Sequence, residues 1–135
     1  MVWAEGATKE EVVAKCEAAG RLVQEKGVER DRQAIGDKKG PFVWKDAYVF
    51  LMDPDGKRIA HPIKPELTQQ DNVVQVKDTD GKLLFVAFIQ VAGDKGSGWV
   101  DYMWPKPGQE NPVAKSSYIY RVPDTPYFVG AGIYK

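Results

Sequence analysis

The chain has 135 residues, the length of a single folded domain. Lysine plus arginine number 19 and aspartate plus glutamate number 19, so the formal net charge is zero. Because no positive excess exists to neutralise phosphates, this balance argues against a nucleic acid partner and against binding to an anionic membrane surface. The 43% hydrophobic and 28% charged composition excludes a disordered chain.

Membrane and disulfide signals are missing from the sequence. No run of about 18 consecutive apolar residues occurs, so no membrane span is predicted. Residues 1–5 show neither the basic nor the apolar region of a signal peptide. The one cysteine, Cys16, cannot form an internal disulfide or a cysteine-based zinc cluster, and we expect it to be a small core residue.

A long amphipathic helix is predicted over about residues 8–35. Thr8 and Glu11 match a capping box, in which both side chains satisfy backbone N–H groups of the first turn. Gly20 and Gly27 weaken or interrupt the helix. An apolar stripe follows from residues that recur at spacings of three and four: Val12, Cys16, Ala19 and Val23.

Strand patterns dominate the rest of the chain. Residues 47–52 and 57–60 flank the Asp53-Pro54-Asp55-Gly56 turn, which predicts a hairpin. Residues 83–91 fit the face of a second helix. Three more strands, joined by short loops, are expected over 99–104, 115–122 and 127–134.

The predicted order is therefore helix, two strands, helix, three strands. No βαβ repeat appears, so we expect an antiparallel sheet of about five strands with helices on one face. The fold class is α+β. One domain is expected over 1–135, with the helix at 8–35 and the sheet core at 42–135.

Catalytic and metal signals are weak. Nucleophilic catalysis needs a base beside a serine or cysteine, and His61 is the only histidine. No phosphate-binding GxxxxGK[ST] pattern exists. We therefore predict no enzyme, no metal and no cofactor. Pairs of aspartates suggest calcium at first sight, but neither pair continues to the final glutamate of an EF-hand, so turn formation is the favoured interpretation of Asp53, Asp55, Asp78 and Asp80.

Aromatic and basic residues gather on two of the predicted strands. Tyr102 and Trp104 share a face, because residues two apart in a strand point the same way. Lys115 and Tyr118 could approach them if the intervening loop closes a hairpin. Their odd spacing places these two on opposite faces unless a bulge intervenes. An aromatic wall with one ammonium can bind a carboxylate; the alternative is ordinary sheet core with Lys115 reaching solvent.

Five segments, in the same order as in the family, resemble the motifs of single Cache sensor domains. The first, Tyr48 to Pro62, resembles the family pattern "YvfvxdxxGxxlaHP". The other four resemble "kDxxGk", "GxGwvxYxwpkP", "KxsYv" and "GtGvY", and they lie at 77–82, 96–107, 115–118 and 130–134.

The resemblance implies a PAS-like fold, with a long N-terminal helix packed on a twisted antiparallel sheet. It also implies periplasmic sensing of a small molecule, commonly a short carboxylate such as acetate, propionate, pyruvate or lactate. Family pocket positions correspond here to His61, Tyr102, Trp104, Lys115 and Tyr118. Lys115 would pair with the ligand carboxylate, His61 and the tyrosine hydroxyls would donate hydrogen bonds, and Trp104 would wall the acyl chain.

Several alternatives stay open. In one alternative, the chain is a structural or interaction domain with a filled core. His61 would then be a residue near a turn whose hydrogen bonds are satisfied within the protein. A small enzyme or a haem sensor with His61 as axial ligand is a third reading. Segment 67–72 lacks a glycine common in the family, which leaves ligand size open. The sequence fits a free-standing periplasmic protein and also a domain of a receptor. It fits a homodimer and also a domain with a membrane receptor partner.

Overall fold

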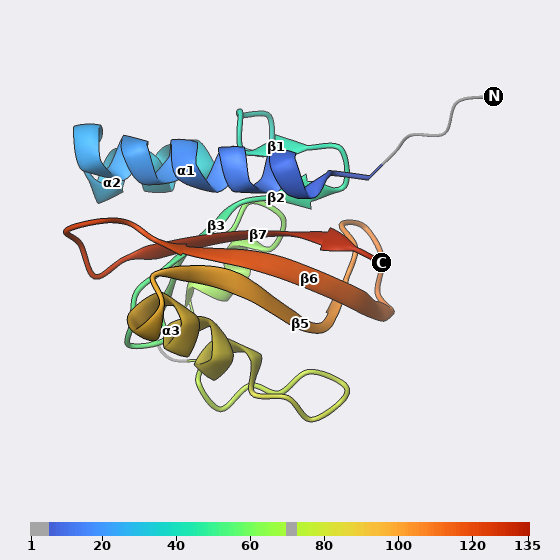
Figure 1. The fold of residues 1–135 in the computed structure, drawn as a ribbon. Coiled ribbons are helices and arrows are strands. Elements are labelled where there is room, and N and C mark those ends of the chain that lie inside the picture. The colour runs from blue at the N-terminus through green and yellow to red at the C-terminus, as the bar shows by residue number, and fades with distance from the viewer. Residues whose placement is uncertain (1–5, 70–72) are drawn as a thin grey trace.

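The protein was analysed as a computed structural model, which describes residues 6–69 and 73–135. Three layers are evident in Figure 1: two helices lie on one side of a central sheet, and a third helix lies on the other side. The helices are α1 (Lys9–Lys26), α2 (Val28–Gly36) and α3 (Leu84–Asp94), and a short 3-10 turn, η1, spans Pro65–Gln69.

The central sheet has five antiparallel strands in the order β4-β3-β7-β6-β5. These strands are β3 (Phe50–Met52), β4 (Arg58–Ala60), β5 (Ser97–Pro105), β6 (Pro112–Arg121) and β7 (Phe128–Tyr134). A small separate ribbon precedes them, made of β1 (Val43–Trp44) and β2 (Ala47–Tyr48). The α+β class, the antiparallel sheet of five strands and its leading helix are confirmed.

The predicted helix over 8–35 is divided in two. Its start is as expected, because the Thr8 hydroxyl accepts from the Glu11 N–H at 3.1 Å and the Glu11 carboxylate accepts from the Thr8 N–H at 2.9 Å. Gly27 has a φ of +88°, a backbone conformation that favours glycine, and it separates α1 from α2. The interruption expected at Gly27 is therefore real, whereas Gly20 is accommodated inside α1.

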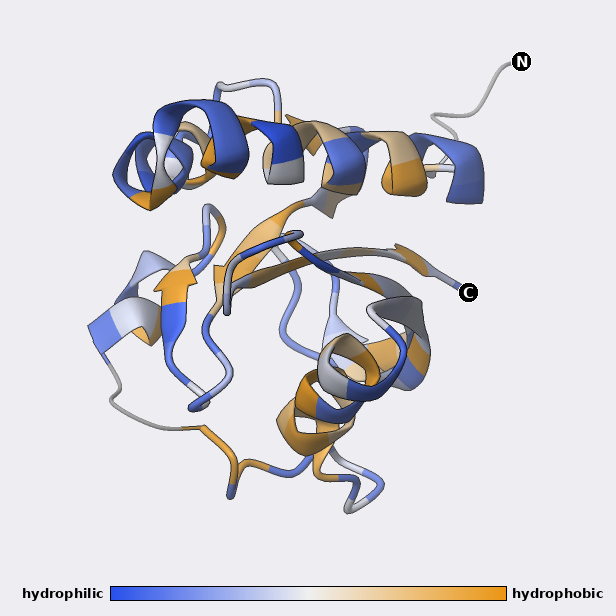
Figure 2. Cartoon of the chain, turned by 60° about the vertical axis from the view of Figure 1, so that its left-hand side comes forward, coloured by the Kyte–Doolittle hydropathy of each residue, from blue (hydrophilic) through white to orange (hydrophobic). Residues whose placement is uncertain are grey.

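The placement of the helices differs from the prediction. Helices cover both faces of the sheet, with α1 against β6 and β7 on one side and α3 against β5 and β6 on the other. The reason lies in β7, where consecutive residues are buried. Because consecutive residues of a strand point to opposite faces, both faces of the sheet are covered there. A second apolar face needs a second cover, and in Figure 2 α3 is mostly hydrophobic whereas α1 alternates between hydrophilic and hydrophobic positions.

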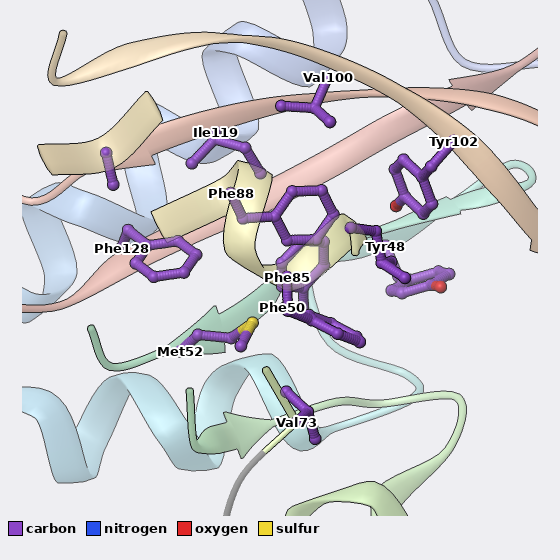
Figure 3. Packing of buried hydrophobic residues seen from close by; sticks show 12 residues of the cluster. Tyr48, Phe50, Met52, Val73, Phe85, Phe88, Val100, Tyr102, Ile119 and Phe128 are labelled. Atoms are coloured by element: carbon purple, nitrogen blue, oxygen red, sulfur yellow. The ribbon is translucent and has the colours of Figure 1, made fainter. Parts of the chain in front are cut away.

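Two separate cores result. The α1 face of the sheet holds Cys16, which is fully buried as predicted, together with small and branched side chains of α1, β3 and β7. The α3 face is rich in aromatic rings and includes a cluster of four: Phe50, Phe85, Phe88 and Tyr102. Figure 3 shows how these rings fill the space beneath α3.

The aspartate pairs form turns, as favoured by the sequence. The Asp53 carboxylate accepts from the N–H groups of Asp55 and Lys57 at 3.0 Å each. Asp78 accepts in the same way from Asp80 and Lys82, at 2.9 Å each. Within residues 6–69 and 73–135, no cluster of acidic, histidine or cysteine side chains is arranged to hold a metal ion. The expectation about segment 67–72 lies partly outside the described residues.

Candidate ligand site

A small cavity lies beneath α3, on the aromatic face of the sheet. Its free volume is about 10 Å³, room for roughly one water molecule. The apolar side of its lining comes mainly from α3 and consists of Phe50, Leu84, Phe85, Phe88 and Trp104. The polar side consists of Tyr48, Arg58, His61 and Tyr102. Figure 3 shows Tyr48 and Tyr102 to one side of the phenylalanine cluster.

Lys115 is buried beside this cavity, in a cage of tyrosines. Only 2% of its surface is exposed. Its Nζ lies 3.2 Å from the Tyr48 hydroxyl, and it stands over the rings of Tyr48, Tyr134 and Tyr102 at 4.4, 5.0 and 5.8 Å from their centroids. Negative ring faces attract an ammonium, so the cage partly replaces the water that burial removes.

The register of the sheet builds this cage. Lys115 of β6 stands directly opposite Tyr102 of β5 on one side and Tyr134 of β7 on the other. The Lys115 side chain passes close to Gly132, which has no side chain of its own. A Cβ at position 132 would lie 2.9 Å from the Lys115 Cε. Three neighbouring strands therefore fix the position of one ammonium group.

Burial controls the charge of Lys115. It lowers the pKa of the ammonium to about 7, and the negative charge of Asp46 opposes this shift in part. Within the described part of the chain, no carboxylate forms an ion pair with Lys115, since the ion pairs found there involve other lysines and an arginine. Lys115 is therefore a buried amine that senses the charge of Asp46 but has no ion-pair partner among these residues.

His61 is a neutral hydrogen-bond donor. Its Nδ1 accepts from the Lys64 N–H at 3.0 Å, so the ring proton is on Nε2. Burial, and then the charge of Lys115, lowers the pKa of His61 to about 3. The ring packs against Tyr48, with centroids 4.7 Å apart.

Tyr102 and Trp104 join the same site. The Tyr102 hydroxyl lies 2.8 Å from the Ser117 Oγ, and both groups are buried. The Tyr102 ring meets Phe88 edge to face at 5.1 Å, and its centroid is 6.2 Å from that of Trp104. Burial raises the pKa of Tyr102, which stays protonated. The structure thus brings four predicted residues together: His61, Tyr102, Trp104 and Lys115.

Tyr118 does not join them. It lies on the opposite face of β6, where its ring is 5.4 Å from Trp99 and 6.4 Å from Tyr120. The pairing of β5 with β6 is continuous across this region, so no bulge turns Tyr118 toward Lys115. The assignment of Tyr118 to the pocket is therefore corrected on geometry: three residues along a regular strand reverse the side chain.

Sequence reasoning missed other groups at the site. Tyr48 and Tyr134 belong to the first and last family-like segments and had not been considered as pocket residues. Arg58 is buried, with its guanidinium 5.0 Å from the centroid of Phe85, and burial lowers its pKa to about 10. Phe85 belongs to α3. It was missed because the sequence did not predict that α3 covers the second face of the sheet and lines the cavity.

Helices on both faces of a five-stranded antiparallel sheet give the domain a PAS-like α+β architecture, and a small cavity with polar and aromatic lining lies between the sheet and α3. The sequence model of the Cache domain family matches residues 42–135. The chain therefore belongs to the Cache domain family, a family of non-catalytic sensor domains.

Two curated relatives are signalling proteins much longer than this chain. The chain is 35% identical over 118 residues to the methyl-accepting chemotaxis protein McpP of Pseudomonas putida, covering 87% of this chain and 21% of that protein. It is 31% identical over 90 residues to the sensor histidine kinase MctS of Rhizobium johnstonii, covering 67% and 19%. The chain thus spans about a fifth of the length of these relatives.

Solved structures agree on the fold. A periplasmic sensor domain of a chemotaxis protein matches with a TM-score of 0.71 and 30% identity, covering 93% of this chain and 88% of that one. A Cache chemosensory domain described in terms of carboxylic acid recognition matches with a TM-score of 0.72 and 33% identity, covering 90% and 80%. A chemotaxis protein of Vibrio parahaemolyticus, 23% identical, matches at 0.77 over 93% and 87% and supports the fold.

The periplasmic location expected from the family resemblance agrees with the first of these structures. Among the described residues, no helix combines the length and apolarity needed to cross a membrane.

Proposed function

We propose that this domain senses short carboxylic acids by binding the carboxylate at Lys115 in the cavity beneath α3. One observation carries the proposal: an ammonium is buried at 2% exposure with a phenol and aromatic rings around it, and no anionic side chain of the described residues forms an ion pair with it. Leaving a charge buried and unpaired is costly, so an anionic ligand adds the interaction that the resting site lacks.

The surrounding groups suit a small monocarboxylate. His61 offers a neutral Nε2–H donor, and Tyr48 offers a phenol that burial keeps protonated by raising its pKa. Phe85, Phe88 and Trp104 add aromatic rings to the lining on the other side of the cavity. Such a division, with polar groups at one end and aromatic rings at the other, favours an acid with a short aliphatic tail.

Cavity size argues for the shortest acids. Space for about one water is too small even for acetate, so binding must displace side chains of the wall. Because α3 supplies most of that wall, we infer that the ligand shifts α3 relative to the sheet. This movement would give the domain two states that a ligand can bias. We place acetate and propionate ahead of pyruvate and lactate on size.

The comparisons support this proposal without naming a ligand for the chain. The Cache domain described for carboxylic acid recognition shares a third of its aligned residues with it. We propose that the domain acts within a chemoreceptor or sensor kinase, as a homodimer or with a membrane receptor partner, because both curated relatives are signalling proteins.

Calorimetric titration tests the proposal. Acetate and propionate are expected to bind the wild-type domain and to raise its melting temperature. Lys115→Ala is expected to weaken binding at least about 100-fold, since truncating one member of a buried charge pair typically costs 2–5 kcal/mol. Lys38→Ala, which removes an exposed lysine, is the matched control and should bind like the wild type.

Two results would overturn it. Unchanged affinity in Lys115→Ala would remove Lys115 from the site. No heat and no thermal shift with any acid of two to five carbons would instead favour a domain whose core is filled and which has no acid ligand.

A further inference from the structure

Lys115 lies next to two hollows of the structure, the cavity beneath α3 and a groove at the surface. Toward α3 it faces the cavity through the rings of Tyr48 and Tyr102. Lys115 and Tyr102 also line a second groove, of about 230 Å³, together with the turn at 78–82, other residues of β5 and β6, and Lys135. The groove is open to solvent, but only 2% of the surface of Lys115 is exposed.

The charged and titratable groups around Lys115 can be named element by element. Tyrosines face it from β2, β5 and β7, His61 lies in the segment after β4, and Arg58 lies on β4. Asp46, between β1 and β2, is the carboxylate whose charge acts on Lys115, and its Oδ1 already accepts from the Ala7 N–H at 2.9 Å. The groove adds Asp78, Asp80, Lys82, Asp101 and Lys135.

Charge balance at this site depends on the ligand. Without a ligand, a charged Lys115 is a buried cation that forms no ion pair among the described residues, whereas a neutral amine can accept from the Tyr48 hydroxyl at 3.2 Å. With a carboxylate present, the charged form gains an ion pair in a water-poor environment, where electrostatic attraction is strong. The ligand and the proton therefore favour one another's binding.

We propose that the domain binds a carboxylate together with a proton, so that it responds to the acid and to acidity at once. This inference rests on the proposed function and deepens it. One proton moves from solvent to the lone pair of the Lys115 Nζ. The carboxylate binds as the anion, no covalent bond forms or breaks, and the pair that enters the site is neutral overall.

Between pH 7 and 9, the neighbouring titratable groups with shifted pKa values keep their protonation state, whereas Lys115 changes its own. Burial lowers the pKa of Lys115 to about 7 and that of His61 to about 3, and it raises the pKa values of Tyr48, Tyr102 and Tyr134. Arg58, with a pKa of about 10, stays charged up to pH 9. Protons taken up between pH 7 and 9 are therefore expected on Lys115.

Calorimetry in paired buffers tests the coupling. Acetate is titrated into the wild-type domain at pH 5.5 and pH 8.5, each time in two buffers with different ionisation enthalpies. The difference in heat reports the protons bound with each acetate. We expect close to zero at pH 5.5, close to one at pH 8.5, and an affinity that falls about tenfold per pH unit above pH 7.

A ligand-free measurement and a variant sharpen the test. The ammonium of Lys115, followed by NMR of ε-labelled lysine, should titrate near pH 7 alone and at least two units higher with saturating acetate. Lys115→Arg keeps a permanent charge, so any acetate binding that it retains should be independent of pH between 6 and 9 and without proton uptake.

The possible failures are distinguishable. Acetate binding with a constant affinity and no proton uptake from pH 6 to 9 would overturn the coupling and leave the proposed function intact. An ordinary lysine pKa near 10 in the free domain would overturn it as well. No acid binding at any pH would overturn the proposed function, and the coupling with it.

Discussion

The two faces of the sheet use the same strands in opposite ways. On the α1 face, side chains such as Val12, Cys16 and Ala131 are fully buried among apolar neighbours, with little polar chemistry. On the α3 face, the core includes Lys115 and His61 at 2% and 5% exposure, held among tyrosines. Side chains on both faces are buried, so the degree of burial alone does not explain how the two faces differ.

The difference lies in what burial costs. Apolar side chains gain free energy when they leave water, whereas an unpaired ammonium loses it. The α1 face is therefore interpreted as the stabilising half of the domain. The α3 face gives up stability to keep polar groups ready for a ligand, as binding sites commonly do. Changes on the two faces should then separate stability from ligand affinity.

The largest effect is expected from a core truncation on the α1 face. Leu51→Ala removes a fully buried side chain of β3 and should lower the free energy of unfolding by about 2–5 kcal/mol. Acetate affinity should stay within about twofold of the wild type at a temperature where both are folded. Denaturant unfolding and calorimetry measure the two quantities, and a parallel loss of affinity would erase the distinction between the faces.

A pair of glycine substitutions compares the faces directly. Gly132→Ala puts a Cβ 2.3 Å from the Ser117 Oγ and 2.9 Å from the Lys115 Cε, so Lys115 must move. We expect at least a tenfold loss of acetate affinity and about 1–3 kcal/mol of stability. Gly20→Ala, on α1, puts a Cβ 2.7 Å from the Tyr120 ring and 3.7 Å from a Val122 methyl group, on the face away from Lys115, and it should leave acetate affinity unchanged.

If both glycine variants bind acetate equally well, the position of Lys115 does not govern binding. Circular dichroism shows first that each variant is folded. Titration at several acetate concentrations then gives the affinities for comparison.

A smaller effect is expected at Ser117. Its Oγ is 2.8 Å from the Tyr102 hydroxyl and orients that phenol within the site. Ser117→Ala should weaken acetate binding about three- to tenfold, in line with the loss of one buried hydrogen bond. The effect should vanish in a Tyr102→Phe background. Ser116→Ala, on the opposite face of β6, is the control, and an equal loss there would point to a general change in the strand.

The smallest effect concerns pH and a site away from the cavity. Asp31 of α2 is fully buried, both carboxylate oxygens lack a hydrogen-bond partner among the described residues, and burial raises its pKa to about 7. Because the unfolded state releases this proton near the ordinary value of 3.8, stability from Asp31 falls as pH rises from about 4 to 7.

Asp31→Asn removes that titration. Its melting temperature should exceed that of the wild type by a few degrees at pH 8 and match it within a degree at pH 4. Scanning calorimetry at the two pH values measures the difference. A gain of the same size at both would show that the carboxyl does not ionise in the folded domain.

Local patterns predicted most of the fold. Helix caps, glycine turns and strand alternation depend on residues close in sequence, so α1, the β3–β4 hairpin and the strands β5 to β7 were anticipated. The position of α3 was not, because which face a helix covers depends on contacts distant in sequence. Family motifs gave four residues of the site. Tyr118 was carried over from the family motif, although the alternation of a regular strand already predicted that it lies on the face opposite Lys115. Tyr134 was missed because only the sheet register brings it to Lys115.

The most direct test of the account is a crystal structure of the domain with propionate. The account predicts one carboxylate oxygen at hydrogen-bond distance, about 2.7–3.2 Å, from the Lys115 Nζ, with the alkyl end against Phe85 and Phe88 of a displaced α3. Propionate bound away from Lys115, or an α3 face unchanged and still closed at saturating propionate, would contradict it.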